Sequence, residues 1–175
     1  MEEGRELLYK GRVFSLMREA VTLPGGRVTR MDIIRHPGAA AMVPVTDAGD
    51  VLLLRQYRHA VGGYIWEIPA GTMDPGETPE ECAARELVEE TGFAAERLER
   101  LSSITPVPGY SSEVIHLFLA TGLVPRTGDL DHDEVLTVHA TPISKVYEMA
   151  ATGEITDAKT LAGLLLARTA LFTSG

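Results

Sequence analysis

The sequence predicts an α/β protein built on one mixed β-sheet with helices on both sides. Three segments have a helical pattern, at residues 79–91, 142–151 and 157–172. Six apolar runs of strand length lie between and before them, at residues 39–45, 51–57, 64–68, 98–105, 114–120 and 135–140. Strands mixed with helices bury their apolar faces most simply in one layered domain. A chain of 175 residues with 45% hydrophobic residues can form such a core.

The first 36 residues are predicted to form a β-hairpin that belongs to the same domain. Extended patterns at residues 12–23 and 27–35 flank the sequence Pro-Gly-Gly, which favours a turn. We therefore divide the chain into an N-terminal element at residues 1–36 and a main domain at residues 37–175.

The main domain contains three connections with clear turn or loop signals. Residues 47–50 read Asp-Ala-Gly-Asp and predict a tight hairpin between the first two core strands. Residues 106–112 are rich in proline and glycine, and residues 123–134 form a polar loop with four acids. After the last strand, Thr141 is predicted to cap the helix that begins at Pro142.

Charge and composition exclude several classes of protein. The net charge is −9 and Lys and Arg are not clustered, which argues against binding to a nucleic-acid backbone. Cys82 is the only cysteine, so an intrachain disulfide is excluded. The N-terminus lacks the features of a signal peptide, and no apolar run approaches 18 residues. We therefore expect a cytoplasmic protein without a membrane partner.

The helix at residues 79–91 has unusually complete start and stop signals. Thr78 is a natural N-cap, Pro79 suits the first helical position, and Glu81 can complete a capping box. Gly92 supplies a left-handed stop. Before the helix, Gly71 and two further turn residues, Pro75 and Gly76, predict an irregular loop.

Three glutamates share one face of this helix. Glu86, Glu89 and Glu90 are spaced i, i+3 and i+4, so their carboxylates lie within about one turn of each other. Like charges at this spacing weaken a helix by roughly 0.2–0.5 kcal/mol per pair. A hard divalent cation such as Mg²⁺ would offset that cost because it prefers carboxylate oxygens. A solvated acidic face is the alternative for three helical glutamates taken alone.

The spacing of the whole segment at residues 71–93 favours the metal site. It fits G-x5-E-x7-R-E-U-x-E-E-x-G-U, where U is aliphatic or aromatic, a match expected by chance on the order of once in 10⁷ chains of this length. The pattern resembles the signature of the Nudix hydrolases at every fixed position. The fixed positions are Gly71, Glu77, Arg85, Glu86, Leu87, Glu89, Glu90, Gly92 and Phe93.

The resemblance implies a fold, a chemistry and a set of ligands. It implies an α/β/α sandwich and Mg²⁺-dependent hydrolysis of a nucleoside diphosphate linked to another group, with Mn²⁺ as an alternative metal. Glu86 and Glu90 would coordinate the metal directly, and Glu89 would be a further or bridging ligand with a catalytic part. The carbonyl of Ala70 would complete the coordination. Arg85 and Glu77 would form an ion pair that fixes the loop to the helix.

Features outside this motif resemble the branch that hydrolyses ADP-ribose and sugar nucleotides. The sequences RQYR at residues 55–58 and WEIPAG at residues 66–71 are typical of it. Arg58 would contact phosphate, which suits the planar, two-pronged guanidinium group, and Glu67 would face the substrate. An outward-facing strand charge is the alternative for Arg58. Pro108 lies 16 residues after Gly92, as in that branch.

The acidic loop at residues 123–134 is the expected source of a general base. In the branch that the sequence resembles, a glutamate of this loop acts as base or late metal ligand. Glu134 matches that position, with Asp131 and Asp133 as the next choices. Ordinary solvated acids are the alternative.

These inferences combine into one functional prediction. We expect a Mg²⁺-dependent pyrophosphatase that cleaves ADP-ribose to AMP and ribose 5-phosphate, and the resemblance implies a homodimer through the N-terminal hairpin. Two alternatives remain open from the sequence. One is a different substrate, such as GDP-mannose, another nucleotide sugar or a dinucleotide, and the other is a non-catalytic domain that senses nucleotides.

Overall fold

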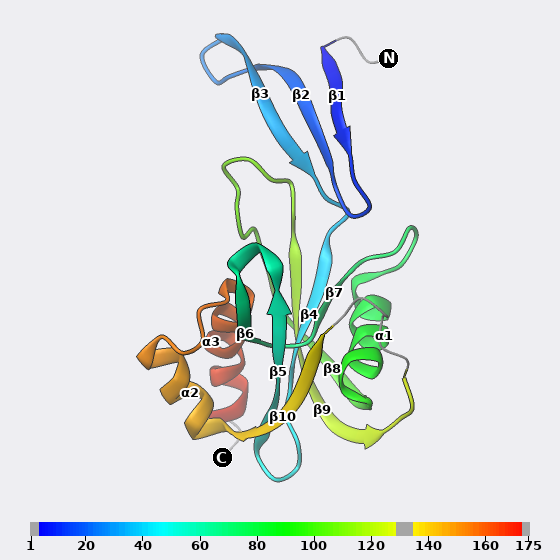
Figure 1. Ribbon diagram of the computed structural model, residues 1–175, viewed down its shortest axis with the longest axis vertical. Coiled ribbons are helices and arrows are strands. Elements are labelled where there is room, and N and C mark those ends of the chain that lie inside the picture. Colours follow the sequence, from blue (N-terminus) through cyan, green and yellow to red (C-terminus); the bar gives the residue numbers. More distant parts are fainter. Residues whose placement is uncertain (1–3, 129–134, 173–175) are drawn as a thin grey trace.

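The computed structural model describes residues 4–128 and 135–172. In it, two β-sheets lie between helix α1 (Pro79–Thr91) on one side and helices α2 (Ile143–Thr152) and α3 (Ala158–Phe172) on the other (Figure 1). This arrangement confirms the predicted α/β/α sandwich. The sheets hold the helices in place, and the site lies between α1 and the start of α3.

The larger sheet has four strands and is mixed. Its order is β7 (Ala70–Thr72), β4 (Ala39–Pro44), β9 (Ile115–Pro125) and β8 (Phe93–Ile104). Strands β4 and β9 run parallel, whereas β7 pairs with β4, and β8 with β9, in antiparallel fashion. The short strand β7 at one edge leads from the sheet into the loop before α1.

The smaller sheet has three antiparallel strands. Its order is β10 (Leu136–Pro142), β5 (Asp50–Arg58) and β6 (Gly63–Glu67), and a single 3₁₀ turn at His59–Val61 joins β5 to β6. An isolated bridge between Val45 and Val51 joins β4 to β5. The single central sheet predicted from the sequence is therefore present as two sheets within the same sandwich.

The core divides along the pleat of strand β4. Ala39, Ala41 and Val43 pack in the cluster that includes residues of α2 and α3. Ala40 and Met42 pack against α1 instead. Successive side chains of a strand point to opposite faces, and β4 is fully buried because helices cover both of its faces. Its alanines leave room for the helices to approach.

Helix α1 begins and ends as its sequence predicts. Thr78 N donates to Glu81 Oε2 over 2.8 Å and Glu81 N donates to Thr78 Oγ1 over 3.2 Å, which makes a complete capping box. Gly92 ends the helix with a φ of 74°. A capped helix of this kind resists fraying, so its acidic face has a fixed position.

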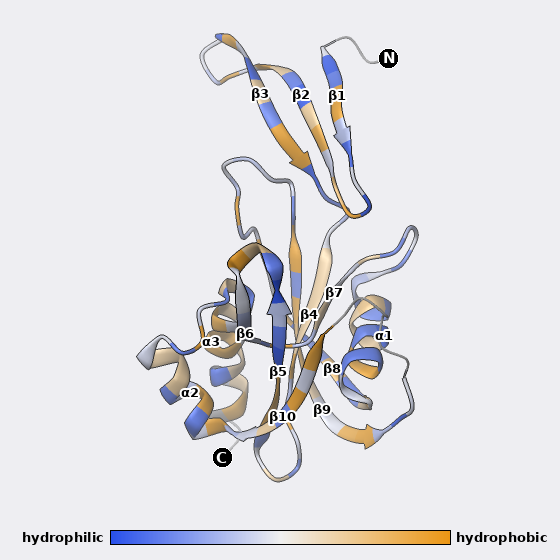
Figure 2. Cartoon of the chain, in the orientation of Figure 1, coloured by the Kyte–Doolittle hydropathy of each residue, from blue (hydrophilic) through white to orange (hydrophobic). Residues whose placement is uncertain are grey.

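The N-terminal element is a separate sheet of three antiparallel strands, β1 (Arg5–Lys10), β2 (Ser15–Thr22) and β3 (Val28–Arg35). It projects from one end of the sandwich, and its strands mix apolar and polar residues (Figures 1 and 2). The structure thus adds one strand to the predicted hairpin. Hydrogen bonds tie this sheet to the loop at residues 106–113: Ile34 N donates to Tyr110 O over 2.8 Å, and Ser112 N donates to Ile34 O over 2.9 Å.

Three local predictions are wrong. Gly71 lies in strand β7 and not in an irregular loop, because β4 offers an unpaired edge beside it. The N-cap of α2 is Pro142 without a side-chain hydrogen bond, since Thr141 is the penultimate residue of β10. Strand β9 continues to Pro125, into the predicted loop, because β8 pairs with it that far. Within the described ranges, no helix is long and apolar enough to span a membrane.

Candidate active site

A cavity of about 780 Å³ opens between helix α1, strand β7 and the start of helix α3. Strand β7 and helix α1 supply Ala70, Gly71, Arg85, Glu86 and Glu89 to one wall. The end of β5 supplies Arg58, and the start of α3 supplies Asp157 and Lys159. Arg12 and Val13, in the turn between β1 and β2, bring the N-terminal element to the same cavity. Segments far apart in sequence therefore meet here.

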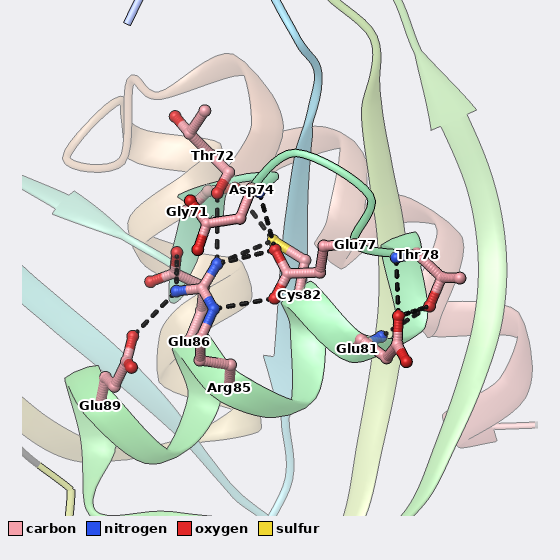
Figure 3. A network of polar contacts seen from close by, with 10 residues as sticks. All are labelled: Gly71, Thr72, Asp74, Glu77, Thr78, Glu81, Cys82, Arg85, Glu86 and Glu89. Atoms are coloured by element: carbon pink, nitrogen blue, oxygen red, sulfur yellow. Dashed lines mark hydrogen bonds and ion pairs between the residues drawn. The ribbon is translucent and has the colours of Figure 1, made fainter. Parts of the chain in front are cut away.

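Contacts with the short strand β7 fix helix α1 against the sheet. Ala70 N donates to Glu90 Oε2 over 2.7 Å, and Arg85 Nη2 donates to Thr72 O over 3.2 Å. The thiol of Cys82 lies 3.6 Å from Gly71 O (Figure 3). Glu90 is 2% exposed, and its carboxylate anchors the backbone of β7.

Gly71 leaves room for the carboxylate of Glu86 beside strand β7. A Cβ atom at this position would lie 1.7 Å from Glu86 Oε1 and 1.8 Å from Glu86 Cδ. The carboxylate of Glu86 therefore occupies the space that any other residue at position 71 would fill. The glycine of the sequence motif has a steric role in this structure.

Arg85 contacts acids of the loop before α1 and of α1 itself. It donates from Nε to Glu77 Oε1 over 2.8 Å and from Nη2 to Glu77 Oε2 over 3.0 Å. Its Nη1 donates to Glu86 Oε1 over 2.7 Å and to Glu89 Oε2 over 2.9 Å (Figure 3). The predicted ion pair between Arg85 and Glu77 is confirmed. One guanidinium group thus neutralises carboxylates from both the loop and the helix.

The pKa values in this network follow from its contacts. The hydrogen bonds from Arg85 lower the pKa of Glu77 to about 2. The same bonds raise the pKa of Arg85, with Glu77 as the first cause. Burial raises the pKa of the Cys82 thiol to about 12. Since the thiolate is the reactive form, Cys82 is a packing residue and not a nucleophile.

The donors on this wall fit a hard divalent cation. Glu86 and Glu89 share one nitrogen of Arg85, so their carboxylates can also share one metal ion. Gly71 leaves the space that the Glu86 carboxylate needs, and all the donors are oxygens, as Mg²⁺ prefers. Among residues 4–128 and 135–172, no three His, Cys, Asp or Glu side chains converge as a ready metal group. Arg85 contacts one oxygen of each of these two glutamates, and an ionised carboxylate has two oxygens that can accept or coordinate.

A second charged cluster forms the opposite wall. Arg58 makes a two-pronged pair with Glu67, with Nε to Oε1 at 2.9 Å and Nη2 to Oε2 at 2.8 Å. Lys159 Nζ donates to Glu67 Oε2 over 2.6 Å and to Asp157 Oδ2 over 3.1 Å. Glu67 is buried and holds both cations at the cavity. Burial alone would raise the pKa of Glu67, but its bonds to Arg58 and the charge of Lys159 outweigh burial, so this pKa is lowered.

The structure brings together several residues that the sequence singled out. Arg58, Ala70, Glu86 and Glu89 line one cavity, whereas the buried carboxylates of Glu67 and Glu90 contact other protein groups. The roles assigned to all of them stay predictions. The three loop acids proposed as a base, Glu134, Asp131 and Asp133, lie outside the described residues.

Sequence reasoning missed Asp157, Lys159 and Arg12 as residues of the cavity. For two of them a signal was available: Asp157 precedes the last helix and Thr160 follows three positions later, which is a capping pattern that fixes Lys159 in the first turn. Arg12 carried no comparable signal. The proline-rich loop also reaches the site, because Pro106 and Glu113 line the cavity.

The fold and this cavity define a class of protein: an α/β/α sandwich with an acidic capped helix facing a cationic wall. The family model of the NUDIX domain matches residues 35–164. A Bacillus subtilis (strain 168) protein named ADP-ribose pyrophosphatase is 37% identical over 159 residues, which cover 90% of this chain and 86% of that protein. The chain therefore belongs to the Nudix family, as its motif predicted.

Two further similarities agree with this assignment. A Mycobacterium tuberculosis (strain ATCC 25618 / H37Rv) protein, also named ADP-ribose pyrophosphatase, is 38% identical over 164 residues, which cover 91% of this chain and 79% of that protein. A solved structure described as an ADP compounds hydrolase superposes with a TM-score of 0.85 and 25% identity, and covers 99% of this chain and 94% of that one. The predicted hydrolase class is confirmed with the family.

Proposed function

We propose that this chain hydrolyses ADP-ribose to AMP and ribose 5-phosphate, with Mg²⁺ as cofactor and Mn²⁺ as an alternative. The observation that carries the proposal is the cavity in which Glu86 and Glu89 face Arg58 and Lys159. Such a pair of walls suits a diphosphate, because one wall can hold a cation and the other can contact phosphate oxygens. The relatives named for ADP-ribose support this choice of substrate.

The charges of the cavity explain why a metal is needed. Among the described residues, its lining includes four cationic side chains, Arg12, Arg58, Arg85 and Lys159, and five acids, Asp74, Glu86, Glu89, Glu113 and Asp157. The lining as a whole is therefore slightly negative, and it should bind a diphosphate less well without a metal ion than with one. One divalent cation reverses the sign of this balance, so substrate and metal should bind cooperatively.

Glu86, Glu89 and Glu90, with the carbonyl of Ala70, are the proposed ligands of the metal. When bound, the ion supplies charge against the phosphate oxygens and lowers the pKa of bound water. Residues of the chain bind and orient the substrate. Arg58 orients a phosphate group with its planar donor set, and Glu67 holds Arg58 in place over 2.8 and 2.9 Å.

Glu134 is the proposed general base, by resemblance and by its place at the end of the acidic loop. It takes a proton from the attacking water as the water oxygen bonds to phosphorus and the bridging oxygen leaves. We predict that Glu134→Gln lowers kcat by roughly 10²–10⁴ with little change in KM. Asp131→Asn and Asp133→Asn are the matched controls. If one of these is crippled while Glu134→Gln turns over normally, the base is a different residue of the loop.

A substrate screen tests the proposal directly. ADP-ribose, GDP-mannose, NADH and diadenosine polyphosphates are incubated with the protein and Mg²⁺, and the products are separated by chromatography. We expect the highest kcat/KM for ADP-ribose, with AMP and ribose 5-phosphate in equal amounts. Faster turnover of another compound would change the substrate, and binding without any turnover would favour a nucleotide sensor.

A homodimer is the proposed assembly, with no nucleic-acid or membrane partner. Strands β1 and β3 leave large apolar side chains exposed, with Leu7, Tyr9 and Val28 between 53% and 67% accessible. Exposed apolar groups on one small sheet favour burial against another subunit. Light scattering after size exclusion distinguishes one chain from two. The cytoplasmic location stays a prediction.

A further inference from the structure

Lys159 stands at a position that is unfavourable for an ordinary structural lysine. It is the second residue of α3, and a cation in the first turn faces the positive end of the helix dipole, which is unfavourable. Its side chain is also only 12% exposed, and a lysine is rarely buried unless it is paired. A lysine at this place therefore needs carboxylate partners at the wall of the cavity.

The ammonium group of Lys159 is held in advance of any ligand. Glu67 and Asp157 accept its hydrogen bonds over 2.6 and 3.1 Å. Asp157 in turn accepts from Thr160 N over 2.9 Å and from Thr160 Oγ1 over 2.6 Å. Ile68 N donates to the same Thr160 hydroxyl over 2.9 Å. The first turn of α3 is therefore locked to the end of β6, and the lysine loses little further entropy on binding a ligand.

We infer that Lys159 is a phosphate-binding residue of this site, which offers its third N–H to the diphosphate of the substrate beside Arg58. An ammonium group has three donors, and within the described ranges its two recorded acceptors are Glu67 and Asp157. Because Glu67 binds both cations, it sets Lys159 and Arg58 side by side. The inference rests on the proposed function, because it needs a diphosphate in this cavity.

The test is the equilibrium binding of ADP-ribose in EDTA, measured by calorimetry on the full chain without turnover. Lys159→Met should weaken binding by roughly ten-fold or more, the worth of one charge-assisted hydrogen bond. Lys159→Arg keeps a positive charge and N–H donors, so it should lose less affinity than Lys159→Met. Lys145→Met is the matched control, since Lys145 pairs with Glu148 on α2 and lies outside the cavity wall.

A second measurement separates phosphate binding from a purely structural tie. Raising the salt concentration weakens contacts between charges by screening, so ADP-ribose binding to Lys159→Met should respond less to salt than binding to wild type. Lys159→Gln replaces the methionine variant if the latter does not fold. Wild-type affinity in the variant, with a lowered melting temperature, would overturn the inference and leave Lys159 as a structural tie. If wild type neither binds ADP-ribose in EDTA nor hydrolyses it with Mg²⁺, the proposed function and the inference are overturned together. If wild type hydrolyses ADP-ribose but does not bind it in EDTA, the KM values of wild type and Lys159→Met with Mg²⁺ are compared, and equal KM values overturn the inference alone.

Discussion

Replacing Gly71 by alanine should inactivate the enzyme without unfolding it. The φ angle of Gly71 is not in the left-handed region, so the backbone accepts an alanine. The added Cβ would lie 1.7 Å from Glu86 Oε1, and the carboxylate must retreat by roughly 2 Å to reach an ordinary contact. The retreating group is the end of a flexible side chain, so the strand and the helix can keep their positions.

The catalytic cost of that retreat should be large. Mg²⁺ accepts ligands only in a narrow range near 2.0–2.1 Å, so a carboxylate displaced by about 2 Å no longer coordinates it. A misplacement of about 1 Å can already cost a factor of about 10², and we expect kcat/KM to fall by at least about 10². Stability should change little, because two effects oppose each other. Alanine stabilises the fold by about 0.4–1 kcal/mol, since it lowers the entropy of the unfolded chain, while one partly buried ion-pair contact between Glu86 and Arg85 is lost.

The assay is AMP release from ADP-ribose at saturating Mg²⁺, beside a melting curve. Gly63→Ala is the matched control, since a Cβ there meets nothing within 4 Å and φ is again not left-handed. Wild-type turnover by Gly71→Ala would refute the role of Glu86. A variant that is inactive because it is unfolded would refute the claim that the clash is confined to a side chain.

Two further predictions concern the charged clusters. Arg58→Ala should raise KM for ADP-ribose about ten-fold with kcat within a few-fold of wild type. Arg55→Ala should leave KM unchanged, because Arg55 Cζ lies 5.2 Å from the ring centroid of Trp66 and Arg55 is not part of the cavity wall. Equal KM values for both variants would show that Arg58 is only a surface charge. Glu77→Gln should lower the free energy of unfolding by about 1–2 kcal/mol at pH 7, after allowance for solvent screening. Because folding depresses the pKa of Glu77 from 4.5 to about 2, this contribution to stability is complete above pH 4.5 and disappears as the pH falls towards 2. Chemical denaturation of both proteins across that window measures the difference between their free energies of unfolding. A difference that does not change with pH would contradict the linkage.

Local signals in the sequence predicted helix α1 well. The capping box of Thr78 and Glu81 and the stop at Gly92 are interactions within one segment, so they depend only on neighbouring residues. The motif also predicted the pair between Arg85 and Glu77, because the family pattern fixes their spacing. Features that depend on neighbouring residues or on a known family pattern could therefore be predicted from the sequence.

Contacts between distant segments could not be predicted in the same way. Strand β7 has three residues and forms because an edge of β4 is available, which no local pattern shows. Lys159 reaches Glu67 across 92 positions, and its sequence neighbours show only a helix start. The division of the sheet likewise depends on how β4 and β5 diverge after the bridge at Val45.

The role of Arg85 links the stability of the site to its chemistry. Like charges on α1 destabilise a helix, and one guanidinium group that contacts both Glu86 and Glu89 offsets this repulsion without a metal. Arg85 uses Nε and Nη2 for Glu77 and Nη1 for the two helix glutamates. The tie to the loop before α1 is therefore made by different nitrogens from the contacts with the helix acids. If the proposed metal ion displaced Nη1 from the helix acids, the two bonds to Glu77 could still hold the loop.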